Sequence, residues 1–214
     1  MDIELNDVET RVLGCLLEKS MTTPDYYPLT LNSLLTACNQ KSNRLPVVSF
    51  DETTVARGLD SLKDKRLVVQ GDSSRVPKYA EILVSSRNLL PQEAAVLMVL
   101  MLRGPQTLGE LRGRSERAFQ FSDLSEVEKR VTEMIESGYV RKLPRLPGRK
   151  EHRYAHLLAG EPRIEAPAAA VEPAMREIKI ENDKIAFLMS EVERLRAELQ
   201  HLREDFSRFK GEFE

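Results

Sequence analysis

The sequence predicts a mainly α-helical protein with small β-hairpins, arranged as two tandem copies of one module and followed by a coiled-coil helix. Three observations support this fold class. Apolar residues at helical spacing recur in the same order in the two halves of residues 5–158. Short β-prone runs separated by turn-rich residues follow the third helical segment of each half. A heptad pattern of apolar residues then extends from residue 178 to residue 209.

The three helices of each module are expected from matched apolar positions and matched capping residues. Apolar residues at helical spacing mark the first and third helices, and a threonine that can cap the N-terminus opens the second. In the first copy these helices begin near Glu9, Thr30 and Asp51. In the second copy the equivalent positions are Glu93, Thr107 and Ser122.

A β-hairpin is expected after each third helix. The first hairpin has β-prone runs at 67–69 and 79–84, and the second has them at 139–141 and 153–158. Three helices followed by a hairpin is the order of a winged helix. We therefore expect winged-helix domains at residues 1–87 and 88–160. Two helical bundles with decorative loops are the alternative.

Several short motifs also resemble those of the YceH-like family of bacterial proteins. They are GCLLEK at 14–19, TTP at 22–24, ACNQKSNR at 37–44, LRGPQT at 102–107 and PGRKE at 147–151. The similarity runs from the N-terminus to about residue 160. It implies a tandem winged-helix protein, and no catalytic residues come with it.

The charge of the chain restricts how it could bind nucleic acid. Its net charge is −2, with −1 on residues 1–87, +3 on residues 88–160 and −4 on residues 161–214. A chain this balanced is no polycation, so any nucleic-acid binding must come from local patches.

A cytoplasmic location without membrane contact is expected. Asp2, Glu4 and Asp7 stand where a signal peptide carries positive charge, and no stretch approaches the ~20 apolar residues of a membrane span. Cys15 and Cys38 are too few for a disulfide framework or a four-ligand zinc site, so both are expected to be buried thiols.

In the first module the third helix and the loop before it are candidates for DNA contact. Opposite its apolar residues this helix is expected to present a face without a carboxylate, made of Thr54, Arg57, Gly58, Ser61 and Lys65. Asp60 and Asp64 are expected toward the flank of this face. Thr54, Arg57 and Ser61 would contact bases or phosphates, and Lys65 the backbone. The preceding loop offers the cations Lys41 and Arg44, although its side-chain amides could instead tie the loop to its own backbone. A solvated polar face is the alternative for the helix.

In the second module the hairpin is the better candidate, because Glu133 and Glu136 on the third helix would repel phosphate. The densest basic cluster of the chain lies on this hairpin, with Glu151 as its one carboxylate, and suits phosphate or minor-groove contact. A charged surface hairpin without a ligand is the alternative. The cluster consists of Arg141, Lys142, Arg145, Arg149, Lys150 and Arg153. A weaker basic patch after the second helix consists of Arg112, Arg114 and Arg117.

No enzyme, cofactor or metal site is expected. The sequence has no phosphate-binding glycine loop, nucleophile elbow or metal-ligand cluster. His152 and His156 are four residues apart on a probable strand, where surface histidines of a basic hairpin are expected rather than a metal pair.

The tail is expected to form a Pro/Ala-rich linker at 161–174 and a coiled-coil helix at 175–210. Mostly β-branched a positions with leucine at d favour a parallel dimer, whereas a helix folded back on its own domains is the alternative. The a positions are Ile178, Ile185, Val192, Leu199 and Phe206, and the d positions are Leu188, Leu195, Leu202 and Phe209.

The functional expectation is a regulatory or chromosome-associated protein that binds double-stranded DNA as a dimer. Tandem winged helices can also serve as protein-docking modules without DNA binding, and the near-neutral charge of this chain suits that alternative as well.

Overall fold

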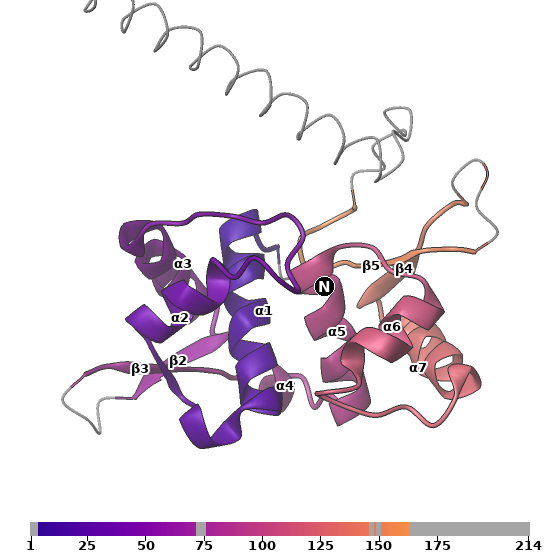
Figure 1. Ribbon diagram of the computed structural model, residues 1–214, viewed down its shortest axis with the longest axis horizontal. Helices are drawn as coiled ribbons and strands as arrows, with labels where there is room; N and C mark the ends of the chain where they lie inside the picture. The colour runs from indigo at the N-terminus through magenta and orange to yellow at the C-terminus, as the bar shows by residue number, and fades with distance from the viewer. Residues whose placement is uncertain (1–3, 72–75, 146–147, 149–150, 163–214) are drawn as a thin grey trace, which may run out of the picture. The chain divides into compact units, whose positions relative to one another are not determined.

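The fold was examined in a computed structural model, which describes residues 4–71, 76–145, 148 and 151–162. These residues belong to one compact unit, Met1–Ile164. The described part of the chain is mainly helical, with two small antiparallel sheets (Figure 1). This arrangement is compatible with winged helices.

The first half is built on α1 (Asp7–Thr22), α2 (Leu31–Cys38) and α3 (Glu52–Asp64). A capping box opens α1, in which Asn6 accepts from the backbone of Glu9 and the Glu9 side chain accepts from the backbone of Asn6. Thr30 caps α2 and Asp51 caps α3, as the sequence predicts. A single 3-10 turn, η1 (Pro24–Tyr26), follows α1.

The sheet of the first half has three strands, one more than the sequence predicts. The order is β1–β3–β2, so that β1 (Leu29–Thr30) adds an edge to the hairpin of β2 (Val68–Gly71) and β3 (Lys78–Glu81). The strand β3 ends at Glu81, whereas the sequence predicts that this strand continues to residue 84. The helix α4 (Leu83–Ser86) begins there, and the Glu81 carboxylate accepts from the backbone N–H of Val84 at 3.1 Å.

The second half repeats this order with α5 (Pro91–Arg103), α6 (Leu108–Ser115) and α7 (Leu124–Glu136). Thr107 caps α6 as expected, whereas Asp123 caps α7 in place of the expected Ser122. The hairpin pairs β4 (Val140–Lys142) with β5 (Tyr154–His156). An antiparallel bridge between Gln106 and Tyr154 takes the position that β1 has in the first half.

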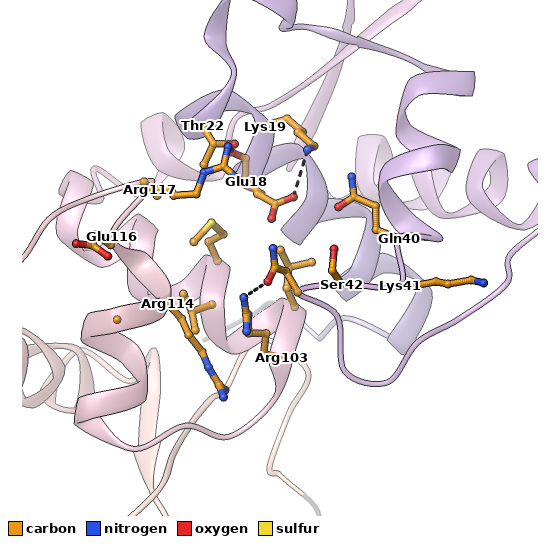
Figure 2. A pocket seen from close by; sticks show the side chains of 16 residues that line it. Glu18, Lys19, Thr22, Gln40, Lys41, Ser42, Arg103, Arg114, Glu116 and Arg117 are labelled. Carbon is orange, nitrogen blue, oxygen red and sulfur yellow. Dashed lines mark hydrogen bonds and ion pairs between the residues drawn. The ribbon is translucent and has the colours of Figure 1, made fainter. Parts of the chain in front are cut away.

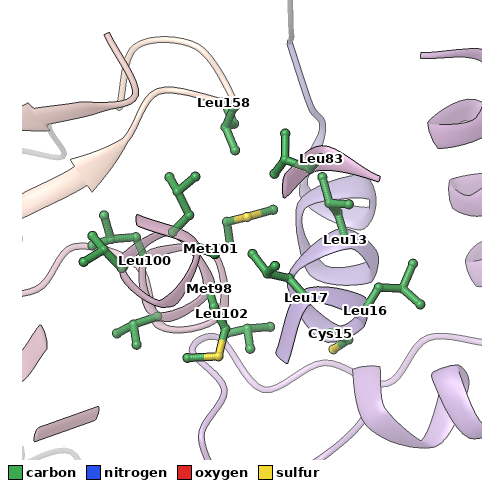
Figure 3. Packing of buried hydrophobic residues seen from close by; sticks show 14 of the residues in the cluster. Leu13, Cys15, Leu16, Leu17, Leu83, Met98, Leu100, Met101, Leu102 and Leu158 are labelled. Atoms are coloured by element: carbon green, nitrogen blue, oxygen red, sulfur yellow. The ribbon is translucent and has the colours of Figure 1, made fainter. Parts of the chain in front are cut away.

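The core runs through both halves because α1 and α5 are each buried on every side. Nine consecutive residues of each helix are buried, Glu9 to Leu17 in α1 and Ala94 to Leu102 in α5. A helix that is buried all round needs partners on every face. Figure 3 shows the two helices side by side, with Leu13 and Leu17 directed toward Met101 and Leu102. The boundary expected between residues 87 and 88 therefore lies within one continuous core, and the division into two domains stays a prediction.

Candidate nucleic-acid interface

The helix α3 places only part of its expected DNA-contacting face in solvent. Val55, Leu59 and Leu62 are buried, as the apolar spacing predicts. Arg57 is exposed on the opposite side, without a hydrogen bond or ion pair among the described residues, and Thr54 is half-buried. Arg57 therefore remains available to a ligand.

Ser61 and Lys65 are held by the first helix. The Lys65 ammonium lies 2.6 Å from the Glu9 carboxylate and donates to the backbone oxygen of Glu4 at 2.7 Å. The Ser61 hydroxyl donates to the same carboxylate. Burial acts to raise the pKa of Glu9, but the hydrogen bonds from Lys65, Ser61 and Asn6 outweigh it, so the pKa is lowered. Ser61 and Lys65 thus join α3 to α1.

The outer face of α3 also differs from its expected composition. Gly58 is buried, and a Cβ at this position would lie 3.0 Å from Cγ1 of Val8 on α1. Gly58 therefore belongs to the packed side of α3, whereas Asp60 and Asp64 are exposed. Asp60 pairs with Lys63 at 2.8 Å. The exposed surface of α3 therefore includes the two carboxylates that were expected at the flank of this face.

The loop before α3 is fixed by its own side chains. The Asn39 side chain both donates to the carbonyl of Phe50 and accepts from its N–H, each at 2.8 Å, which agrees with the structural role considered for the loop amides. Arg44 is 5% exposed and donates to the Glu18 carboxylate at 2.6 and 3.1 Å. Arg44 is therefore committed to the fold rather than to phosphate. Lys41 is exposed, with no hydrogen bond or ion pair in the described ranges.

The helix α7 presents a mixed face to solvent. Lys129, Thr132 and Glu136 are exposed, and Glu133 is half-buried and pairs with Arg130. This agrees with the acidic character expected of this helix. Phosphate would meet carboxylates on α7 as well as on α3.

The second hairpin holds some of its cations internally and leaves others in solvent. Arg141 pairs with Glu161, and Arg153 lies 3.0 Å from Glu110 and donates to the carbonyl of Pro105 at 2.7 Å. Lys142 is exposed, with no hydrogen bond or ion pair among the described residues. Arg145 is exposed and donates to His152 at 3.0 Å. Arg149 and Lys150 lie outside the described residues.

The two histidines of this hairpin have different surroundings. His152 contacts the carbonyl of Leu143 at 3.0 Å, whereas Nδ1 of His156 is buried without a hydrogen-bond partner. Burial lowers the pKa of His156 to about 4, so it is neutral near pH 7. Both histidines are half-buried, and only His156 has a buried ring nitrogen without a partner among the described residues. Among the described residues no group of three or more His, Cys, Asp or Glu side chains could hold a metal ion.

The structure also bears on the predictions for the two cysteines, for membrane-spanning helices and for the C-terminal tail. Cys15 and Cys38 are both free and buried, as predicted. No helix in the described ranges combines the length and the apolar character needed to cross a bilayer. The expected linker from residue 163 onward and the coiled-coil positions from Ile178 to Phe209 lie outside the described residues.

One grouping of cations was missed by sequence reasoning. Lys41 from the first half lines the same cavity as Arg114 and Arg117 from the second half, together with Lys19 and Arg103 (Figure 2). These residues are far apart in the sequence, and only the packing of α1 against α5 brings them together. No local spacing signals such a site.

Comparisons with known proteins identify the family. The family described as "Protein of unknown function, DUF480" matches residues 5–149. The UPF0502 protein of Geobacter sulfurreducens is 53% identical over 219 residues, covering the whole of both chains. The UPF0502 protein of Solibacter usitatus is 52% identical over 208 residues, covering 96% of this chain and all of its own. The similarity thus extends through both halves, and the chain belongs to the DUF480, or UPF0502, family of bacterial proteins.

Proposed function

We propose that this chain is a tandem winged-helix protein that binds double-stranded DNA through phosphate contacts, with little reading of base sequence. The observation that carries this proposal is the second hairpin. Lys142 and Arg145 are exposed there without a carboxylate partner, and Arg149 and Lys150 follow in the sequence. Clustered cations on a hairpin neutralise phosphates and release counterions, which is the main source of non-specific affinity.

Base reading is a weaker part of the function because of the charge on the third helices. A recognition helix in the major groove passes close to both phosphate backbones. Asp60 and Asp64 on α3, and Glu136 on α7, are exposed where they would repel phosphate. Arg57 and Thr54 are therefore proposed as secondary contacts. Of the other contacts expected in the first half, Ser61, Lys65 and Arg44 are left out because they have partners within the protein.

The tail completes the proposed assembly. We infer that residues 175–210 form a parallel coiled coil, because the heptad pattern places mostly β-branched residues at a and mostly leucine at d. Glu181 at a d position weakens the first heptad. A dimer would carry two basic hairpins and thus double the number of phosphate contacts. A regulatory or chromosome-associated role fits such a protein. We also propose that the YceH-like proteins are part of the same family, because the motifs at 14–19 and 37–44 resemble theirs.

The proposal is tested by removing exposed cations from the hairpin. The double variant Lys142→Ala/Arg145→Ala should weaken binding to duplexes of any sequence. It should also reduce the slope of log affinity against log salt by up to about two units per chain, since each lost phosphate contact contributes about 0.9. Fluorescence anisotropy of random duplex at several salt concentrations measures both effects.

A matched control separates the hairpin from general charge. The variant Arg87→Ala/Lys129→Ala also removes two exposed cations that make no hydrogen bond or ion pair within the described ranges. Its net charge equals that of the hairpin variant. Because neither residue lies on the hairpin, this control should bind DNA nearly as tightly as the natural chain does. Equal losses in both variants would remove the hairpin from the interface.

A protein-docking module is the second candidate, favoured by a different observation. The exposed carboxylates on α3 and α7 would disfavour DNA on the helices that winged-helix proteins usually place in the groove. Exposed apolar side chains suit protein contact, among them Leu45, Val47 and Leu124. This candidate predicts no measurable duplex binding even at low salt.

A further inference from the structure

A cavity of about 740 Å³ opens between segments that come from both halves of the described chain. Its walls come from the end of α1, the loop after α2, the end of α5 and the end of α6 with the residues that follow it (Figure 2). Cavities of roughly 300–1,000 Å³ are typical of small-molecule sites. The size and position of this cavity therefore suit a ligand rather than a packing defect.

The cavity has more cations than its carboxylates can neutralise. The cations Lys19, Lys41, Arg103, Arg114 and Arg117 line it, against Glu18 and Glu116. Glu18 is already the partner of the buried Arg44, at 2.6 Å. The lining therefore has a positive excess.

The arginines of the cavity have few anionic partners of their own. Arg103 donates to the neutral side chain of Asn43. Arg114 donates to Gln106 and lies 3.4 Å from Glu110, a carboxylate that it shares with Arg153. Arg117 is exposed, with no hydrogen bond or ion pair among the described residues. Guanidinium groups with so few anionic partners keep donors for an incoming phosphate.

The rest of the lining is mixed: Thr22, Gln40, Ser42 and Asn43 are polar, and the apolar part comes mainly from α5. Met98, Val99 and Leu102 contribute to it, together with Ala118. A ligand that uses both parts of the cavity needs an anionic group for the arginines and an apolar body for this surface. A free inorganic anion would use only the first part.

We propose that this cavity binds a phosphorylated small molecule of nucleotide size, with its phosphates on the cations of the lining and its apolar part against α5. Binding at this site does not depend on the proposed DNA binding, because it is measured on the protein alone. A ligand here would contact both halves of the described chain at once.

The direct test is calorimetric titration of the full chain with ADP, GDP, CDP and UDP, and with pyrophosphate and adenosine as partial ligands. At least one nucleotide should bind about tenfold more tightly than pyrophosphate, and adenosine should bind more weakly still. Absence of binding by all four nucleotides at about 1 mM would overturn the proposal. Equal affinity for pyrophosphate would also overturn it, because the apolar surface would then contribute nothing.

Blocking the cavity locates the site. Gly113 lines the cavity on α6, and no atom lies within 4 Å of where its Cβ would be, so Gly113→Leu would extend a side chain into the space. The matched control is Gly109→Leu on the same helix, which is outside the cavity and has its nearest atom at 4.0 Å. Both changes favour the helix, so neither should unfold the protein.

The variant Gly113→Leu should weaken nucleotide binding at least about tenfold, whereas Gly109→Leu should leave it unchanged. Lys41→Ala/Arg117→Ala should give a similar loss, because both side chains are exposed and have no partner among the described residues. Unchanged affinity in both cavity variants would place the nucleotide elsewhere and refute this site.

Discussion

Two buried arginines fix the end of α2 and the loop that follows. Arg11 donates to the carbonyl of Cys38 at 3.1 Å and to that of Pro46 at 2.5 Å, and Arg44 donates to the carbonyl of Ala37 at 3.2 Å. The last carbonyls of a helix lack partners within it and carry its negative partial charge. Two guanidinium groups therefore stabilise the C-terminus of α2, and the loop keeps Lys41 at the surface.

His156, whose Nδ1 is buried, should make the free energy of unfolding depend on pH. The pKa of His156 is about 4 in the folded chain, against an ordinary value of 6.5, because burial disfavours its charged form. The unfolded chain therefore binds a proton first, and the free energy of unfolding should fall as the pH drops from about 6.5 toward 4.

The His156→Gln variant should remove this part of the pH dependence. Urea unfolding of both chains at several pH values between 4 and 7 measures the difference. Parallel curves for the natural chain and the variant would contradict the assignment to His156.

At the scale of elements, a glycine allows α1 and α5 to approach closely. A Cβ on Gly14 would lie 3.0 Å from Cδ2 of Leu102 and 3.2 Å from Cβ of Met101. Alanine normally stabilises a helix by up to about 1 kcal/mol relative to glycine. Gly14→Ala should nevertheless lower the free energy of unfolding by about 1–3 kcal/mol, because the neighbouring side chains must move.

The control for this packing prediction is the same change on another helix. Gly109 on α6 has no neighbour closer than 4.0 Å, so Gly109→Ala should be neutral or stabilising by up to about 1 kcal/mol. Urea unfolding of the two variants compares them directly. A stabilising Gly14→Ala would mean that α1 and α5 are farther apart than described.

The helices were predictable from sequence, whereas the small strands were less so. Matched apolar spacing and the caps Thr30, Asp51 and Thr107 predicted the helices because both signals are local. The strand β1 has two residues, Leu29 and Thr30, and exists through its pairing with the distant Lys78 and Tyr79. Such a strand has no periodicity of its own to detect.

The orientation of the candidate side chains was the part that sequence reasoning could not supply. Helical periodicity placed Ser61 and Lys65 opposite the apolar residues of α3. In the structure both side chains instead contact the buried carboxylate of Glu9 on α1. The same periodicity placed Gly58 on the outer face, whereas it is buried against Val8. These effects depend on contacts across more than 40 residues of sequence, for example Lys65 to Glu9, so the candidate site was only partly predictable.

At the scale of the whole molecule, the hydrophobic core is formed by residues within the described part of the chain. It extends from Leu5 to Leu158 and includes the interface of α1 with α5. Deleting residues 175–214 should therefore leave a folded chain. It should be monomeric and bind duplex more weakly, because the proposed coiled coil is lost.

Sedimentation equilibrium of the full and shortened chains tests this assembly. The full chain should be a dimer at micromolar concentration, and the shortened chain a monomer with unchanged circular dichroism of its folded part. If the full chain is monomeric, the tail folds back or binds another protein, and the docking module becomes the better account.

The most direct test of the proposed function is the affinity of the natural chain for random duplex DNA at about 50 and 200 mM salt. Proteins that make six to ten phosphate contacts lose roughly 10³–10⁵ in affinity over this range. A dimer with two basic hairpins should bind at the lower salt and lose at least about a hundredfold at the higher. Failure to bind at 50 mM, or an affinity that is the same at both concentrations, would contradict DNA binding through phosphate contacts.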